Sequence, residues 1–204
     1  MKMKNIIFDL GGVILTHEIN LMPNIISAMF QISHEEASDF WETKKHQMLV
    51  GNLSSENFIR YVKTNLKSDI PIHQLICSWN ELYIQKAENI DWGLLNIIDR
   101  LRDKYKLYLL TDTIDTHDDY NKNRGIYDKF DQVFKSHIEG VSKITDSAFL
   151  KVLRKIKAKP DECIFIDDLR DNIIRARKIG MISILYKSRI DLQKKLVQLK
   201  VISE

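Results

Sequence analysis

Four places in the chain carry polar side chains where an apolar segment ends. They are a lone aspartate, Asp9, a threonine, Thr111, a lysine, Lys143, and an acidic pair, Asp167-Asp168. Carboxylate oxygens are hard ligands that suit Mg²⁺ rather than zinc. Apposed carboxylates also repel one another unless a cation lies between them. If the fold brings Asp9 to the acidic pair, these residues therefore predict a magnesium site.

Thr111 and Lys143 would equip such a site for chemistry at phosphorus. The hydroxyl of Thr111 can donate a hydrogen bond and Lys143 carries a positive charge, so both would stabilise the equatorial oxygens of a phosphoryl group while Asp9 attacks phosphorus. Each residue also has an ordinary interpretation: the aspartates and the threonine as turn or helix caps, and the lysine as a solvated side chain, as most lysines are. Their joint order and placement favour the functional interpretation.

The segments that must position these side chains have the pattern of buried parallel strands. Residues 4–9 contain the run Ile6-Ile7-Phe8, which is too apolar for a solvated edge. Gly11 and Gly12 follow Asp9 directly, so the backbone can turn sharply and a ligand can approach closely. The other expected strands are residues 106–111, 131–134, 163–166 and 182–186.

Helical patterns separate these strands and fill a long insertion after the first. A capping box at residues 33–36, a serine cap at Ser54 and a proline at Pro71 each begin a helix, and residues 91–102 form a fourth. Further helices are expected at 146–157, from Ile173 to Gly180, and after Ile190. Strands that alternate with helices predict a doubly wound parallel sheet, and the four consecutive helices predict an inserted bundle.

We therefore expect an α/β fold in which residues 1–16 and 97–204 form the sheet core and residues 17–96 form a helical bundle. The polar sites would then meet at one sheet edge, because the carboxyl ends of parallel strands converge there. The length of 204 residues suits one domain with a modest insertion.

Composition narrows the classes of function. The net charge of +3 is only mildly basic, and the basic residues 151–159 lie as a solvated helix face would, so we expect no nucleic-acid partner. No apolar run approaches the ~20 residues of a membrane helix, and we expect neither a signal peptide nor a membrane partner. Cys77 and Cys163 are far apart without a CxxC motif, so reduced thiols and a cytoplasmic location are expected.

The order of these sites resembles that of the haloacid dehalogenase-like (HAD) hydrolase superfamily over nearly the whole chain. The first motif matches Phe8-Asp9-Leu10-Gly11-Gly12-Val13 and the second Leu109-Leu110-Thr111. The third matches Lys143 ahead of the helix at 146–157, and the fourth matches residues 164–173, which run on into residues 176–181. The resemblance implies a Rossmann-like core, and it implies that the helical insertion is a cap over the site.

The resemblance also implies a role for each residue. Asp9 would be the nucleophile that forms an aspartyl-phosphate, and Asp9, the backbone carbonyl of Gly11 and Asp168 would hold Mg²⁺. Thr111 and Lys143 would bind the phosphoryl oxygens. Asp167 and Asn172 would support the metal indirectly or through water. Dehalogenases of this superfamily lack the metal and the acidic pair, so the pair favours a phosphatase acting on a small phosphorylated metabolite.

Three positions depart from the phosphatase pattern. Gly11 stands where the pattern has a second aspartate that acts as general acid and base, and such a group is commonly worth 10²–10⁴-fold in rate. We therefore expect slow turnover or a need for a good leaving group. Asp112 follows Thr111 where asparagine is common, either beside the phosphoryl group or as a displaced acid, and Ile144 follows Lys143 where proline is common. His17 and His117 lie close enough to the motifs to donate a proton.

Two other functions account for part of this pattern. Gly11 and Asp112 suit a non-catalytic HAD protein that binds or regulates. A two-component receiver domain uses the same residue types, but there the acidic pair comes first, whereas here the single aspartate leads and the chain is longer. Substrate identity and oligomeric state are not readable from the sequence.

Overall fold

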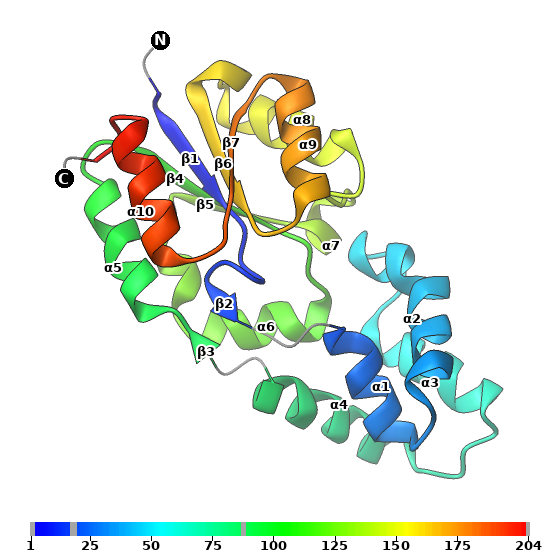
Figure 1. Ribbon diagram of the computed structural model, residues 1–204. Coiled ribbons are helices and arrows are strands. Elements are labelled where there is room, and N and C mark those ends of the chain that lie inside the picture. The colour runs from blue at the N-terminus through cyan, green and yellow to red at the C-terminus, as the bar shows by residue number, and fades with distance from the viewer. Residues whose placement is uncertain (1–2, 17–19, 87–88, 203–204) are drawn as a thin grey trace.

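A computed structural model describes residues 3–16, 20–86 and 89–202, and its centre is a parallel sheet of five strands. The strands lie in the order β5-β4-β1-β6-β7, so β1 is central (Figure 1). This confirms the expected α/β fold with a parallel sheet. The strands are β1 (Asn5–Phe8), β4 (Lys106–Thr111), β5 (Gln132–Lys135), β6 (Cys163–Asp167) and β7 (Ile182–Leu185).

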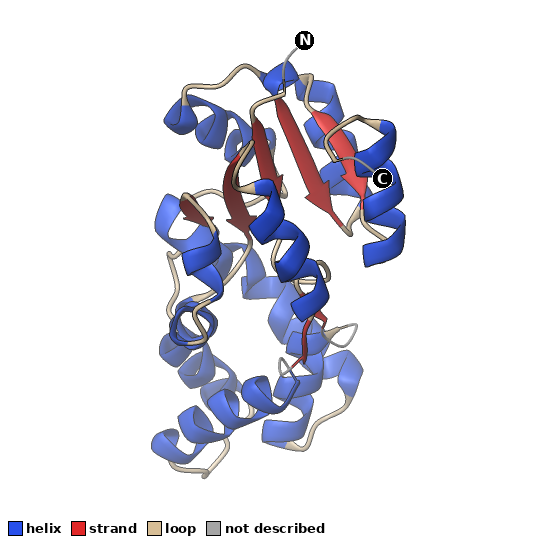
Figure 2. Cartoon of the chain, turned by 90° about the vertical axis from the view of Figure 1, so that its left-hand side faces the viewer, coloured by secondary structure: helices blue, strands red, loops and turns tan. Residues whose placement is uncertain are grey.

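Helices cover both faces of this sheet because successive residues of β1 point in opposite directions. Ile6 and Phe8 pack with α5 (Trp92–Leu101) and α10 (Arg189–Gln198) on one face. Ile7 packs with α8 (Asp146–Ile156) and α9 (Arg170–Ile179) on the other. Figure 2 shows the sheet between these two helical layers. All three side chains are fully buried, so β1 lies in the middle of the core.

Four further helices form a bundle with a hydrophobic cluster of its own, below the sheet in Figure 1. Ser33 and Ser54 cap two of them through side-chain bonds from the nitrogens of Glu36 and Asn57, as expected. Large apolar side chains such as Phe58 and Trp79 fill the middle of the bundle. The helices are α1 (Leu21–Phe30), α2 (His34–Leu49), α3 (Ser55–Asn65) and α4 (Ile72–Lys86).

The membership of this bundle differs from expectation. The expected fourth member, residues 91–102, is α5, and its Leu94, Ile98 and Leu101 pack with the sheet rather than with the bundle. The fourth helix of the bundle is α1. The expected boundary at residue 96 falls inside α5, which runs from Trp92 to Leu101. A helical apolar stripe shows that a helix is buried but does not show against which partner.

A short antiparallel ribbon connects the bundle to the sheet. It pairs β2 (Leu15–Thr16) with β3 (Asn89–Ile90), which lie on either side of the bundle in the sequence. The nitrogen of Asp91 also donates to the carbonyl of Ile14 at 2.9 Å. The chain thus leaves and re-enters the core at the same place, and the bundle is an insertion at the end of β1.

The connection after β4 holds helices that the sequence pattern did not predict. Helix α6 (Asp115–Asn123) is strongly polar and carries no apolar stripe, and its buried residues are His117, Asp118 and Asn121. Short turns complete the core: η1 (Ile126–Lys129), α7 (Ser136–Glu139) and η2 (Pro160–Glu162). Among the described residues, no helix combines the length and apolarity that crossing a membrane requires.

Candidate active site

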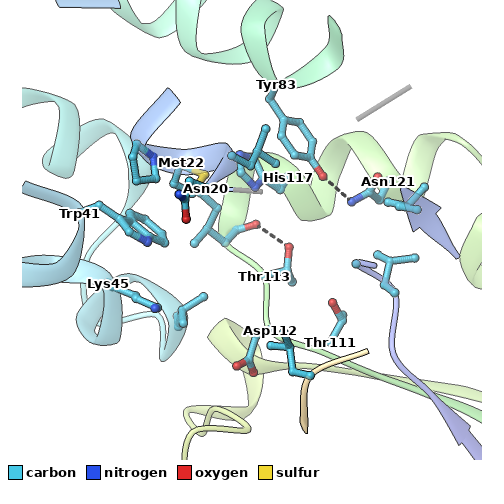
Figure 3. Close-up of a pocket in the computed structure, with 18 of the residues that line it drawn as sticks. Asn20, Met22, Trp41, Lys45, Tyr83, Thr111, Asp112, Thr113, His117 and Asn121 are labelled. Carbon is cyan, nitrogen blue, oxygen red and sulfur yellow. Dashed lines mark hydrogen bonds between the residues drawn. The ribbon is translucent and has the colours of Figure 1, made fainter. Parts of the chain in front are cut away.

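A cavity of about 400 Å³ opens at the carboxyl ends of the central strands (Figure 3). Leu10 and Gly11 follow β1, Thr111 ends β4, and Leu169 follows β6, and all four line this cavity. Thr111 is only 2% exposed. The bundle contributes the facing wall, chiefly from α2. The cavity therefore lies between the sheet edge and the bundle, where ligands of open α/β sheets bind.

Three carboxylates converge beside this cavity. Asp9, Asp167 and Asp168 each offer an oxygen, and these oxygens lie within 4.8 Å of one another. Asp9 stands directly after β1, and the acidic pair stands at the end of β6, the strand next to it. The parallel register of the two strands thus brings together residues that are more than 150 positions apart in the sequence.

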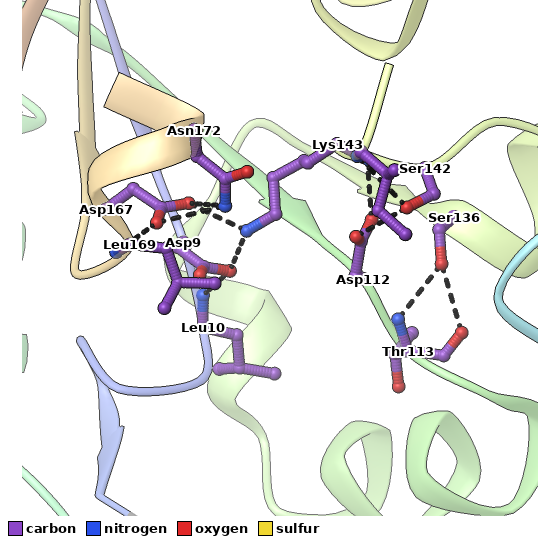
Figure 4. Close-up of polar contacts among 11 residues, drawn as sticks. Asp9, Leu10, Asp112, Thr113, Ser136, Ser142, Lys143, Asp167, Leu169 and Asn172 are labelled. Carbon is purple, nitrogen blue, oxygen red and sulfur yellow. Dashed lines mark hydrogen bonds and ion pairs between the residues drawn. The ribbon is translucent and has the colours of Figure 1, made fainter. Parts of the chain in front are cut away.

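Lys143 lies between two of these carboxylates (Figure 4). Its Nζ is 2.7 Å from Oδ1 of Asp9 and 2.8 Å from Oδ2 of Asp167, and the residue is 3% exposed. Burial alone would lower the pKa of Lys143, but the charges of Asp167, Asp9 and Asp112 outweigh it and raise the pKa. The solvated-lysine interpretation is therefore wrong, and Lys143 is a fixed cation in the site.

The carboxyl group of Asp9 is buried near more negative than positive charge. Burial raises the pKa of its carboxyl well above the usual range; Asp167 and Asp168 act in the same direction, and Lys143 opposes them. Its Oδ1 accepts a hydrogen bond from the nitrogen of Leu10 at 2.7 Å. Without a further cation, three clustered carboxylates face a single ammonium group, and a divalent ion would restore the balance.

Asp167 is fully buried and engaged by neighbouring donors. Its oxygens accept bonds from Asn172 Nδ2 at 3.1 and 3.0 Å and from the nitrogen of Leu169 at 2.8 Å, besides the Lys143 contact. These contacts suit a carboxylate that orients its neighbours. Asp168 is more accessible than Asp167 and stands next to the turn that follows β1.

The turn after Asp9 leaves room for the carboxylate of Asp168. Gly12 has φ +74°, and a Cβ added there would lie 2.1 Å from Oδ2 of Asp168. A side chain at position 12 would therefore displace that carboxylate from the cluster. The oxygen-only donors and this cradle fit a hard divalent cation such as Mg²⁺.

The carboxylate of Asp112 is turned toward the loop that carries Lys143. It accepts bonds from Ser142 Oγ at 2.7 Å and from the nitrogen of Lys143 at 3.0 Å. Both oxygens of Asp112 are engaged in positioning the loop, and a role of this side chain in phosphate binding or as a displaced acid stays a prediction. Ser142 Oγ in turn accepts a bond from the nitrogen of Ile144 at 3.3 Å, so no proline is needed to shape this turn.

Of the two histidines near the motifs, His17 and His117, the structure places His117. His117 lies in the wall of the cavity and stacks on Tyr83, with ring centroids 3.5 Å apart. Tyr83 accepts a bond from Asn121 Nδ2 at 2.9 Å, and burial raises the pKa of its phenol to about 12. His17 lies outside the described residues.

Comparison with known proteins agrees with this geometry. A model of the haloacid dehalogenase-like hydrolase family matches residues 3–180. The chain belongs to this family. The family match covers both the sheet core up to α9 and the inserted bundle.

Curated relatives of this HAD hydrolase include enzymes that act on phosphate esters. A D-ribitol-5-phosphate phosphatase of Bacteroides thetaiotaomicron is 23% identical over 190 residues, 87% of this chain and 88% of that protein. A sesquiterpene phosphatase of Aspergillus oryzae is 36% identical over 58 residues, 28% of this chain and 30% of that protein. A drimenol cyclase of Aspergillus calidoustus matches 34% of this chain and only 13% of its own length, at 33% identity.

Solved HAD structures share the complete architecture. A HAD-like hydrolase of Porphyromonas gingivalis superposes with a TM-score of 0.81 at 23% identity and covers 98% of both chains. A HAD family enzyme of B. thetaiotaomicron, solved with magnesium and inorganic phosphate, superposes at 0.76 and 22% identity, covering 92% of this chain and 96% of that one. At these identities the likeness concerns the fold alone.

The sequence pattern missed several residues of this HAD site. Gly12 was noted as a flexible residue, but its closeness to Asp168 depends on the distant strand β6. Ser142 has no distinguishing pattern at all. Of the α6 residues that line the cavity, the sequence singles out His117 but not Asn121, and it singles out none of the α2 residues. Only the fold reveals which face of these helices is turned toward the cavity.

Proposed function

We propose that this HAD hydrolase is a Mg²⁺-dependent phosphatase of a small phosphorylated metabolite, with Asp9 as its nucleophile. The observation that carries the proposal is the cluster of Asp9, Asp167 and Asp168 around Lys143 at the edge of the cavity. Two curated relatives with phosphatase names support it, as does the neighbour solved with magnesium and inorganic phosphate.

The donors present suggest how the metal would be held. Asp9, Asp168 and the backbone carbonyl of Gly11 would bind Mg²⁺, and Asp167 and Asn172 would keep these donors in place. Bound Mg²⁺ would supply positive charge to the phosphoryl oxygens and neutralise the carboxylates. The Gly12 cradle supports this assignment, because it lets Asp168 approach the turn after Asp9.

The chain's own residues would carry out two displacements at phosphorus. A carboxylate oxygen of Asp9 forms a bond to phosphorus while the bond to the leaving oxygen breaks, and the leaving oxygen takes a proton from solvent and departs as an alcohol. Water then attacks phosphorus and loses a proton to solvent, while the bond between phosphorus and the Asp9 oxygen breaks and inorganic phosphate is released. The hydroxyl of Thr111 and the ammonium of Lys143 would stabilise the charge on the phosphoryl oxygens in both steps.

Gly11 shapes the rate expected of this mechanism. A glycine cannot donate the proton that an alkoxide leaving group needs, whereas a phenolate with a low pKa leaves without one. We therefore expect p-nitrophenyl phosphate to be hydrolysed more readily than alkyl phosphates.

We also infer that the α1–α4 bundle is a cap, because α2 forms a wall of the cavity opposite Thr111. The cap would then lie between β2 and β3 in the sequence and would include residues 20–86. A cytoplasmic location stays a prediction, supported by the two free cysteines.

Hydrolysis of p-nitrophenyl phosphate with Mg²⁺ tests the proposal. The native chain and the Asp171→Asn control, which alters an exposed carboxylate on α9, should hydrolyse the ester, whereas Asp9→Asn should lose at least 10³-fold. Removal of Mg²⁺ with a chelator should have the same effect as Asp9→Asn. Equal background rates for all three proteins would instead favour a non-catalytic HAD protein that binds its ligand.

A further inference from the structure

One stripe of helix α2 faces the cavity. Each member lies three or four residues from another member, which places them on a single helix face. Two of them, Trp41 and Leu49, also pack into the hydrophobic cluster of the bundle, as their neighbours Ala37 and Met48 do. The cavity-facing residues are Ser38, Trp41, Glu42, Lys45 and Leu49.

Three of these five side chains are polar, and the rest of the cavity lining mixes apolar residues with polar ones such as Asn20 and Thr113. Lys45 extends its ammonium group toward the cavity, opposite Thr111 and Asp112 (Figure 3). Its Nζ lies 3.3 Å from Oε1 of Glu42, an exposed pair of the kind that contributes little to stability. This charge pair is therefore not required by the fold, and it is placed where a ligand would contact it.

Trp41 gives the stripe a rigid apolar centre. It is 7% exposed, and it packs edge-on against Phe58 with ring centroids 6.2 Å apart. The part of the indole that reaches the cavity is thus held in one orientation. A flat aromatic surface beside a lysine and a carboxylate offers contacts both to C–H groups and to hydroxyls.

The direction of the leaving group follows from the shape of the site. Gly11 and Thr111 form the floor of the cavity at the phosphoryl position, and the α2 stripe forms the opposite wall. An ester bound with its phosphorus beside Asp9 would therefore extend the rest of the molecule toward α2. A hydrocarbon leaving group would exclude water from Lys45 and Glu42 and offer them no hydrogen bond beyond the one between them, which is costly.

Resting on the proposed phosphatase function, we propose that the leaving group is polyhydroxylated, so that the substrate is a sugar or polyol phosphate. Lys45 is the specificity-determining residue: it donates to a hydroxyl oxygen, while Glu42 and Ser38 accept from neighbouring hydroxyls and Trp41 covers the C–H groups. A site built to hydrogen-bond substrate hydroxyls rejects analogues that lack them.

The pair of adjacent lysines on α2 provides a matched test. Lys45→Met removes the charge that faces the cavity, and Lys44→Met removes a charge whose Nζ lies over the Tyr61 ring, 4.8 Å from its centroid. For a panel of sugar and polyol phosphates, Lys45→Met should lower kcat/KM about 10- to 100-fold, the loss expected for a hydrogen bond to a charged donor. Lys44→Met should leave kcat/KM within about twofold for these esters and for p-nitrophenyl phosphate alike, and the loss in Lys45→Met should be larger for the hydroxylated esters than for p-nitrophenyl phosphate.

Binding measurements separate this inference from the proposed function. In an Asp9→Asn background with Mg²⁺, adding Lys45→Met should weaken binding of the best sugar or polyol phosphate by the same factor and leave inorganic phosphate binding unchanged. Equal losses in Lys44→Met and Lys45→Met, or a preference of the native chain for prenyl phosphates over hydroxylated esters, would overturn the inference. Absence of p-nitrophenyl phosphate hydrolysis would instead contradict the phosphatase proposal, and the binding result would still decide the role of Lys45.

Discussion

At the residue scale, three carboxylates hold Lys143 in the site through short contacts. Lys143 neutralises Asp9 and Asp167 directly, and Asp112 holds the backbone of Lys143 from the opposite direction. Asp9 and the acidic pair were predictable from sequence because each directly follows an apolar strand. The burial of Lys143 was not, since nothing in its neighbouring residues distinguishes it from a surface lysine. Its position depends on the Asp112 contact, which joins two loops 31 residues apart.

The role of Asp112 can be tested by comparing how much kcat/KM falls in Asp112→Asn for esters with different leaving groups. Asp112→Asn replaces one acceptor with an NH₂ group that cannot accept from Ser142 or from the nitrogen of Lys143. Since the lysine loop would then shift, kcat/KM should fall by about tenfold, equally for p-nitrophenyl phosphate and for alkyl phosphates. Steady-state kinetics on both ester types measures this. A loss confined to alkyl phosphates would show instead that Asp112 is the general acid.

The pKa of Asp9 predicts that magnesium binding depends on pH. Because burial and the neighbouring carboxylates raise this pKa, the metal-free protein retains a proton on Asp9 below it, and the metal must displace that proton. Affinity for Mg²⁺ should therefore fall about tenfold per pH unit below this pKa and level off above it. Without metal, the raised pKa means that the folded state binds more protons than the unfolded state, so the free energy of unfolding decreases as pH rises through it.

Calorimetric titration with Mg²⁺ in two buffers of different ionisation enthalpy measures this proton release. The native chain and Asp171→Asn should release a proton, and Asp9→Asn should release none. Release that is unchanged in Asp9→Asn would assign the proton to another group.

At the element scale, the turn after β1 is as important for bringing the carboxylates together as the strand itself. Ile6, Ile7 and Phe8 determine where β1 lies, but Gly12 determines whether Asp168 can reach the cluster. The long-range contact explains why a glycine stands at position 12, three residues after Asp9. A local interpretation of the same residues sees only a flexible turn.

Two glycines with positive φ separate the effect of this contact from backbone strain. Gly12→Ala should cost about 1–2 kcal/mol in the free energy of unfolding and should also weaken Mg²⁺ binding at least tenfold, because the new Cβ displaces Asp168. Gly180→Ala has φ +99° but its Cβ would meet only Pro160 at 3.5 Å, so it should lose similar stability and retain its Mg²⁺ affinity. Denaturant unfolding and Mg²⁺ titration of both variants test this, and equal Mg²⁺ affinities would refute the contact's role.

Helices were less predictable than strands for reasons that differ from one helix to the next. The stripe of α5 was correctly identified as apolar, but it packs on the sheet rather than in the bundle. Helix α6 was missed because it buries His117, Asp118 and Asn121 instead of apolar side chains. Its polar residues find partners on other elements, such as Tyr83 for Asn121 and Lys135 for Asp118. No local pattern records such partners.

At the scale of the whole molecule, the bundle is joined to the core by the β2–β3 ribbon and also contacts the core at α6 and at α7. The β2–β3 ribbon carries both chain connections, and α6 provides a second contact away from it. There, Asp115 accepts bonds from the nitrogen and the hydroxyl of Ser55, and Trp79 Nε1 donates to Thr116 Oγ1 at 3.0 Å. Gly51, at the end of α2, approaches the carbonyl of His137 so closely that a Cβ would lie 2.2 Å from it. Helix α2 is therefore positioned over the site by the core itself.

Removing the acceptor at this second contact should loosen the bundle without altering the metal site. Asp115→Ala removes the acceptor of the buried backbone nitrogen of Ser55, although the Ser55 hydroxyl can still bond Thr116 Oγ1. The free energy of unfolding should therefore fall by about 1–3 kcal/mol, and amides near the start of α3 should exchange faster with solvent. Because α2 carries the stripe that we propose to contact the leaving group, KM for hydroxylated esters should rise more than KM for p-nitrophenyl phosphate. Asp119→Ala, an exposed change on the same helix, should alter stability by no more than about 0.5 kcal/mol. Hydrogen-exchange mass spectrometry of residues 50–60 and kinetics on both esters measure these effects. Unchanged exchange in Asp115→Ala would mean that the contact between Asp115 and Ser55 does not hold the bundle in place.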